Sequence, residues 1–176
     1  MVRGQCGCSR SRFVSVLLKC ALVAIVGVFV AAFITPRAQA EDSHDLLVVR
    51  DVKRPFADVR TDLQNAIINQ GLKVDLNGHI GDMLKRTAAD IGAKGDLYTE
   101  AEYFTFCSSR LSRAMMEADP VNMGLCPYTM FVYQKTGSDD VTVGYKAMVM
   151  RGDEKSQTTL KEINALLQSI LDEAAE

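Results

Sequence analysis

The chain has 176 residues, with 20 Lys and Arg against 22 Asp and Glu. Residues 1–40 hold five of the basic residues and none of the acidic ones, so the remaining 136 residues carry 15 basic and 22 acidic side chains, a net charge of about −7. This negative charge argues against a nucleic-acid partner, whose binding requires basic surface. A chain of this length is expected to form one domain with its own hydrophobic core.

The first forty residues have the parts of a secretory signal peptide. Four basic residues come first (Arg3, Arg10, Arg12 and Lys19). The apolar run Cys20–Ile34 is shorter than the roughly twenty residues that span a bilayer, and Ala38-Gln39-Ala40 has the small residues of a cleavage site. We therefore predict a signal peptide over 1–40, cleavage after Ala40 and a periplasmic or secreted domain over 41–176. The alternative is an uncleaved membrane anchor, in which Val14–Leu18 lengthens the apolar run.

The first part of the mature chain alternates between strand and helix. Leu46–Val49 predicts a strand that is buried on both faces. Pro55 suits the first turn of a helix, and apolar residues recur at helical spacing from Phe56 to Ile67. Residues 72–76 alternate between apolar and polar, which predicts a half-buried strand ended by a turn at Asn77-Gly78.

The middle of the chain continues the alternation. Apolar spacing from Ile80 to Ile91 predicts a second helix. In the next strand Phe104 and Phe106 face one way, and Tyr103, Thr105 and Cys107 the other. Ser108 or Ser109 is expected to cap a third helix, which Asp119-Pro120 ends because a residue before proline disfavours the helical conformation.

The last part predicts a hairpin and a helix. Residues 128–134 and 141–149 read as two strands joined by a loop at 136–140. Thr159 and Glu162 form a capping box for the final helix, whose apolar stripe runs to Ala174. The order β-α-β-α-β-α-β-β-α predicts an α+β fold, a two-layer sandwich with helices on one face of a mostly antiparallel sheet.

Cys107 and Cys126 are the two cysteines outside the signal peptide. In an exported protein they can form a disulfide, which needs Cα atoms within about 7 Å. A helix returning along the sheet would separate them, but residues 119–125 are long enough to bring the chain back. The other interpretation is a functional thiol, since the helix N-terminus after Cys107 favours a thiolate; no C-x-x-C motif is present.

Metal and catalytic motifs are weak. The methionines could offer sulfur to copper(I), but they are not clustered and most are expected to pack in the core. His44 and His79 are isolated from other ligands, so we predict no metal ligands and no cofactor. The sequence has no Ser/His/Asp arrangement and no glycine-rich phosphate loop, and Arg110 and Arg113 are expected to be surface residues.

Several short motifs resemble one known family. They are Phe106-Cys107, Leu111-Ser112, Met115-Met116, Asp119-Pro120, Cys126-Pro127-Tyr128 and Val132-Tyr133, together with the upstream pattern of Phe56, Val59, Leu63 and Gly71. The chain resembles the domain-of-unknown-function 302 family (DUF302) over about Val48–Ala147, as an exported branch with two cysteines. The resemblance implies a compact two-layer domain that forms homodimers, and it brings no reaction, ligand or catalytic residue.

These patterns together predict a non-enzymatic extracytoplasmic domain that binds a small ligand or a partner protein. The surface near Cys107, Asp119, Pro127 and Tyr128 is the expected binding region. One alternative is a thiol-redox or sulfur-handling protein that uses Cys107 and Cys126. A second alternative is soft-metal or haem binding through sulfur.

Overall fold

The structure, a computed structural model, describes residues 46–176. The predicted signal peptide and its cleavage site lie outside these residues. The elements are β1 (Leu47–Val52), α2 (Phe56–Asn69), β2 (Val74–Gly78), α3 (Ile80–Thr87), β3 (Tyr98–Phe106), α4 (Ser109–Ala118), the 3₁₀ helix η2 (Pro120–Leu125), β4 (Tyr128–Lys135), β5 (Val141–Lys146) and α5 (Glu154–Ala174). Of the helices in this part of the chain, none combines the length and the apolar character needed to cross a membrane.

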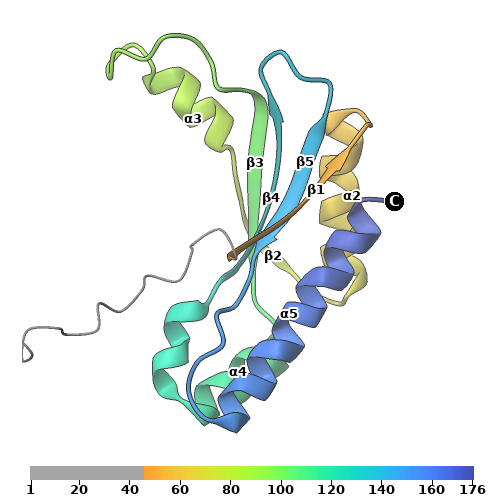
Figure 1. Cartoon of the computed structure of the whole chain (residues 1–176), viewed down its shortest axis with the longest axis vertical. Helices are drawn as coiled ribbons and strands as arrows, with labels where there is room; N and C mark the ends of the chain where they lie inside the picture. Colours follow the sequence, from red (N-terminus) through yellow and green to blue (C-terminus); the bar gives the residue numbers. More distant parts are fainter. Residues whose placement is uncertain (1–45) are drawn as a thin grey trace, which may run out of the picture. The chain divides into compact units, whose positions relative to one another are not determined.

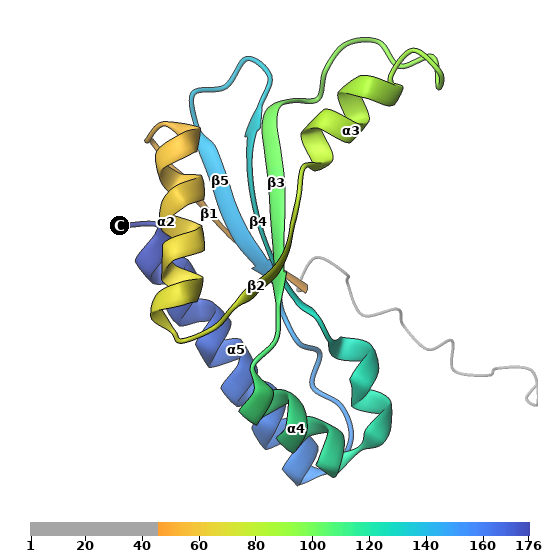
Figure 2. The same cartoon turned by 180° about the vertical axis from the view of Figure 1, so that it is seen from behind.

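The five strands form one sheet in the order β1-β5-β4-β3-β2, and every neighbouring pair is antiparallel. Helices α2 and α5 pack together over one face of this sheet (Figures 1 and 2). The predicted two-layer α+β sandwich is therefore confirmed. Helix α3 is the exception to the one-sided arrangement, because it lies against β3 on the other face.

The hydrophobic core lies between the sheet and α2, α4 and α5. Alternation along the strands directs one set of side chains inward: Phe104, Phe106, Tyr128, Met130, Val132, Val141, Val143 and Tyr145. The helices meet them with a second buried set: Val59, Leu63, Ala66, Ile67, Leu111, Met115, Leu160, Ile163, Leu167 and Ile170. Met115, Met130 and Met148 are buried, which confirms core packing for these methionines.

Three predictions in the first half of the chain were wrong. The first strand is not buried on both faces, since Leu47 and Val49 are each 54% exposed. It is an edge strand, and these side chains lie on the face of the sheet opposite α2 and α5. The helix predicted to reach Ile91 ends at Thr87, and Ile91 is 71% exposed. Asn77-Gly78 belongs to β2 rather than to a turn, because these residues pair with Phe104 and Tyr103.

The beginning of the last helix also differs from the prediction. Helix α5 starts at Glu154, where Asp153 accepts a hydrogen bond from the Ser156 backbone N–H at 2.8 Å. Thr159 is therefore not a cap; its hydroxyl donates to the Lys155 carbonyl inside the helix at 3.2 Å. The preceding strand stops at Lys146 instead of Val149. The chain then turns sharply through Gly152, whose φ of +77° explains how a cap forms earlier than predicted.

Helix α4 and η2 lie together beyond the end of the sheet, beside the first turns of α5 (Figure 1). We call residues 108–125 the α4–η2 lobe. Asn122, fully buried, holds this lobe together, since its amide donates to the Met115 carbonyl at 2.9 Å and to the Ser156 hydroxyl at 2.7 Å. Its carbonyl oxygen accepts a hydrogen bond from Arg151. These contacts join α4, η2 and the start of α5.

Candidate functional site

The two cysteines lie at one end of the sheet, on adjacent strands. Phe106, the last residue of β3, pairs with Tyr128, the first residue of β4. Cys107 is therefore the residue directly after the end of β3. Cys126 lies two residues before the start of β4. Helix α4 carries the chain away from the sheet and η2 brings it back, as the length of 119–125 allowed. The return of the chain thus places the two cysteines at the same end of adjacent strands.

Ser112 of α4 lies beside this pair. Its Oγ is 3.3 Å from the sulfur of Cys126 and 3.0 Å from the hydroxyl oxygen of Tyr128. Of the two predicted caps, Ser108 is the one observed: it accepts a hydrogen bond from the Leu111 backbone N–H at 3.4 Å and starts the helix that presents Ser112. Both cysteines are free thiols and partly buried. The cluster consists of two thiols and two hydroxyls.

The surroundings of Cys107 disfavour its thiolate. Burial is the largest cause, and a hydrogen bond with Cys126 and the charge of that group add to it. The Tyr128 backbone and the Ser112 hydroxyl act in the opposite direction, and the balance raises the pKa of Cys107 from 9.0 to about 11. Burial likewise raises the pKa of the Tyr128 hydroxyl to about 12. The expected activation of Cys107 by the helix N-terminus is therefore outweighed by burial.

The other predicted site residues occupy different environments. Tyr128 is fully buried, so only its hydroxyl meets the cluster, through Ser112. Asp119 caps η2 by accepting a hydrogen bond from the Val121 backbone N–H at 3.0 Å and lies 3.5 Å from Arg151. Pro127 is exposed and follows Cys126 through a cis peptide bond. Whether they bind a ligand stays a prediction.

Metal ligands do not gather around the cysteines. Within residues 46–176, no three or more His, Cys, Asp and Glu side chains are placed to hold a metal ion. His79 lies at the start of α3, where its Nδ1 is 3.5 Å from a carboxylate oxygen of Glu102. His44 lies outside the described residues. Among His, Cys, Asp and Glu side chains of the described residues, a metal at this position would therefore have the two cysteines as its ligands.

A second candidate region is the face of the sheet opposite α2 and α5, which we call the open face. It holds a groove of about 510 Å³, bordered on one side by Ile80 and Leu84 of α3. Leu47, Val49, Tyr98, Ala101, Glu102, Tyr103, Phe131, Val132 and Tyr133 complete the lining. The aromatic rings contact one another: Phe131 and Tyr133 are stacked with centroids 6.3 Å apart, and Tyr98 lies 5.2 Å from Tyr133.

Glycines on neighbouring strands allow two of these rings to lie flat on the sheet. Gly144 of β5 pairs with Phe131, and a Cβ at Gly144 would come within 2.9 Å of the ring. Gly78 of β2 pairs with Tyr103, and a Cβ there would come within 2.2 Å of that ring. Each ring therefore occupies the space that a side chain on the glycine would fill, and the aromatic rings lie close to the backbone of the sheet.

The open-face aromatics were not predicted as a site. Their signal is present in the sequence, because β3 and β4 carry large side chains on both faces. Such strands are expected to be covered on both sides. In a fold with helices mainly on one side, the second set of large side chains remains accessible.

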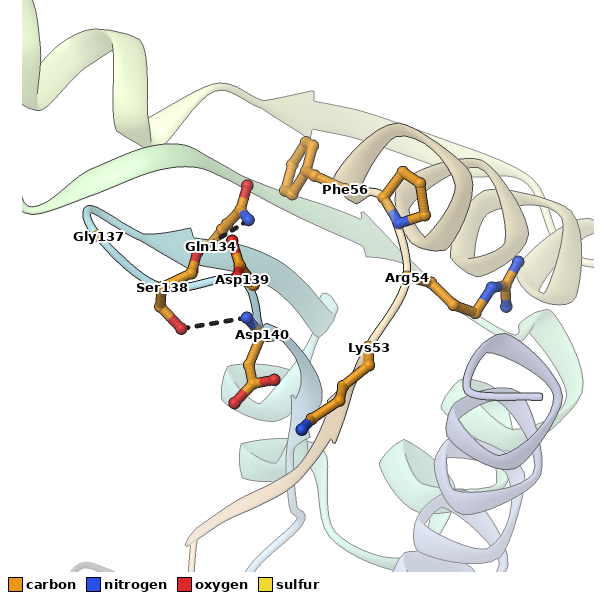
Figure 3. A pocket seen from close by; sticks show the side chains of 9 residues that line it. Lys53, Arg54, Phe56, Gln134, Gly137, Ser138, Asp139 and Asp140 are labelled. Atoms are coloured by element: carbon orange, nitrogen blue, oxygen red, sulfur yellow. Dashed lines mark hydrogen bonds between the residues drawn. The ribbon is translucent and has the colours of Figure 1, made fainter.

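A third hollow lies between the β1–α2 turn and the β4–β5 hairpin (Figure 3). It measures about 840 Å³ and is lined by Lys53, Arg54, Pro55, Phe56, Gln134, Gly137, Ser138, Asp139 and Asp140. Most of its polar groups serve the fold: Gln134 donates to the Ser138 carbonyl, the Ser138 hydroxyl accepts from the Asp140 N–H, and Arg54 pairs with Asp62. We therefore regard this hollow as a structural gap beside the β4–β5 hairpin and not as a candidate site.

Comparisons with known proteins agree on the fold. The chain matches the family described as Domain of unknown function DUF302 over residues 48–174. It is also similar to the crystal structure of an uncharacterized conserved DUF302 protein from Bacillus stearothermophilus, with a TM-score of 0.62 and 15% identity, covering 74% of this chain and 98% of that one. None of the curated proteins compared with the chain matches it. The predicted resemblance to DUF302 is therefore confirmed, while the exported branch with two cysteines stays a prediction, and the chain belongs to the DUF302 family.

Proposed function

We propose that this domain is a non-enzymatic, extracytoplasmic binding module, and that the open face of its sheet binds a small, flat and uncharged apolar ligand. The observation that carries the proposal is the groove lined by Tyr98, Tyr103, Phe131 and Tyr133. Exposed apolar patches that combine several aromatic side chains are a feature of binding surfaces.

The dimensions of the groove favour a small molecule. Ligand pockets measure roughly 300–1,000 Å³ and combine apolar walls with a few polar groups. The groove of about 510 Å³ lies in this range. Its polar groups are the hydroxyls of Tyr98, Tyr103 and Tyr133, and none of the three is hydrogen-bonded to another of residues 46–176 in the structure. These hydroxyls are therefore available to a ligand that stacks on the rings.

The lining offers little to an enzyme. Glu102 is its one carboxylate, and that group already pairs with Arg60 at 3.0 Å and accepts a hydrogen bond from Asn77 at 2.8 Å. The remaining lining residues are aliphatic or aromatic. Apart from the three tyrosine hydroxyls, no lining side chain offers a free acid, base or nucleophile to the groove, so binding without chemical conversion is the better supported function.

The test is a fluorescence titration of the full chain with N-phenyl-1-naphthylamine, a neutral aromatic probe. We expect saturable binding of one probe per chain. Replacing Tyr133 with serine should weaken probe binding about 10-fold, a loss of about 1.4 kcal/mol, because the Tyr133 ring links the aromatic surface by stacking on Phe131 and contacting Tyr98. Met123→Ser, which alters an exposed apolar residue far from the groove in the α4–η2 lobe, is the matched control and should leave the affinity unchanged.

Two outcomes would overturn the proposal. One is equal probe affinity in the wild type and Tyr133→Ser. The other is a dimer, seen by sedimentation, that Tyr133→Ser dissociates and that excludes the probe. In the second case the occupant of the open face would be another copy of the chain instead of a small ligand.

A further inference from the structure

The connection between the sheet and the α4–η2 lobe is narrow. Cys107 joins β3 to α4, and Cys126 joins η2 to β4, so the chain enters and leaves the lobe at its two cysteines. These residues flank the last β3–β4 pair, Phe106 and Tyr128. Any bond between the cysteines would therefore close the lobe at its base.

The local contacts hold the two thiols in place. Cys107 and Cys126 flank the same β3–β4 pair, and Cys126 is one of the groups that raise the pKa of Cys107. Ser112 lies 3.3 Å from the Cys126 sulfur and is itself tied to the buried Tyr128 hydroxyl. Both cysteines are partly buried in short connections, Cys107 between the end of β3 and the capped helix α4, and Cys126 between η2 and β4. The two free thiols thus lie at the same end of adjacent strands, with Ser112 beside the Cys126 sulfur.

We propose that Cys107 and Cys126 form a structural disulfide that closes the base of the α4–η2 lobe. The oxidant is a low-molecular-weight or protein disulfide. The thiolate of one cysteine attacks a sulfur of this disulfide and expels the first thiolate; the second cysteine then attacks the mixed bond and expels the other. Two electrons pass to the oxidant, one S–S bond forms for one broken, and the two cysteine protons go to the departing thiolates.

The surroundings favour a structural bond over a redox catalyst. Catalytic dithiols are stabilised in the reduced form by a thiolate of lowered pKa, which makes their disulfides strong oxidants. At Cys107, burial and Cys126 raise the pKa instead, to about 11. The reduced form gains no stabilisation from a thiolate near neutral pH. The disulfide, once formed, should accordingly resist reduction. The same argument weighs against a metal, which requires deprotonated thiols.

Closing the loop should have a large effect on stability. The bond encloses about twenty residues, and in the chain-entropy treatment a loop of that length lowers the equilibrium constant for unfolding by about 100-fold. The enclosed segment contains α4, whose Leu111 and Met115 are buried in the core. The gain should thus appear in global unfolding as well as in local opening of the lobe.

The experiment uses the full chain with Cys6, Cys8 and Cys20 replaced by serine, which leaves the pair as its only thiols. The reduced protein is incubated with oxidised glutathione, its free thiols are alkylated, and its peptides are mapped by mass spectrometry. We expect a Cys107–Cys126 crosslinked peptide. The unfolding equilibrium constant of the oxidised protein should be about 100-fold below that of the same protein after reduction. This comparison needs no further variant, so a failure to fold cannot obscure it.

A Cys107→Ser variant, with and without glutathione disulfide, is the matched control and should show no change in unfolding. Three results would overturn the inference. They are two free thiols after exposure to the oxidant, a disulfide that leaves stability unchanged, and acceleration of insulin reduction by the protein, which marks a redox catalyst. The open-face probe titration is separate, so each proposal can fail while the other stands.

Discussion

Replacing Gly144 with alanine is a direct test of how the sheet and its open face are built. Gly144 lies in β5, between Phe131 of β4 and Val49 of β1. A Cβ at this position would stand 2.4 Å from the carbonyl oxygen of Val48, 2.9 Å from the Phe131 ring and 3.0 Å from the Val49 side chain. The first of these contacts involves backbone, so a side-chain rotation cannot relieve it.

The cost follows from two opposing effects. Overpacking in a well-packed site costs about 1–3 kcal/mol, and a backbone contact favours the upper end of this range. Alanine is less flexible than glycine in the unfolded chain and recovers about 0.5–1 kcal/mol. We therefore expect Gly144→Ala to lower the free energy of unfolding by about 2 kcal/mol.

The assay is urea unfolding of the full chain, in which a lower midpoint at an unchanged slope reports lost stability. Gly124→Ala is the matched control, because no atom lies within 4 Å of a Cβ there and its φ is not positive. That variant should stay within about 0.5 kcal/mol of the wild type. In a Phe131→Ala background Gly144→Ala should still destabilise, since the Val48 carbonyl remains. Equal stability of the Gly144 and Gly124 variants would refute the described pairing of β1 with β5.

Three further predictions concern polar groups. Asn122→Ala should cost about 2–3 kcal/mol in urea unfolding, because it leaves the Met115 carbonyl and the Ser156 hydroxyl without their buried partner; a loss below 0.5 kcal/mol would contradict the role given to Asn122. Alkylation of Cys107 in the reduced protein, followed by mass spectrometry, should keep accelerating about tenfold per pH unit beyond pH 9, because its pKa is raised to about 11; a plateau near pH 9 would show an ordinary thiol. The protonated Tyr128 stabilises the fold fully below pH 10, and this contribution is lost as the pH rises towards its folded pKa of about 12. Tyr128→Phe should accordingly lose stability less steeply than the wild type between pH 10 and 12, and parallel pH profiles would contradict the shift.

Local patterns in the sequence were sufficient for most of the fold. Alternation placed Phe104 and Phe106 on the core face, and Asp119-Pro120 marked the end of α4 as expected. Errors arose where a second signal competed with the one used. The sequence at Thr159 fits a capping box. In the structure, however, Asp153, which follows a turn at Gly152, caps the helix, so the helix begins six residues before the predicted cap would place it. Such a preference depends on the backbone path, which sequence spacing does not encode.

The candidate sites were harder to predict than the fold. Whether Cys107 and Cys126 lie at the same end of the sheet depended on the path of residues 119–125. The length of this segment was compatible with such a return but did not require it. The raised pKa of Cys107 could not be anticipated, because it arises from burial and from Cys126, whereas the sequence displayed the helix N-terminus. The polar contacts of Asn122 with Met115 and Ser156 join segments up to 34 residues apart, and no local motif marks them.

The cysteine pair and the open face are linked through the register of β3 and β4. Adjacent residues on a strand face opposite sides, so a slip of one residue would turn Tyr103 inward and Phe104 outward. In the observed register Phe106 pairs with Tyr128, and this pairing brings the two cysteines together. A disulfide between them is compatible with this register and would oppose a slip. The proposed bond would therefore stabilise the lobe and also keep the aromatic side chains on the open face.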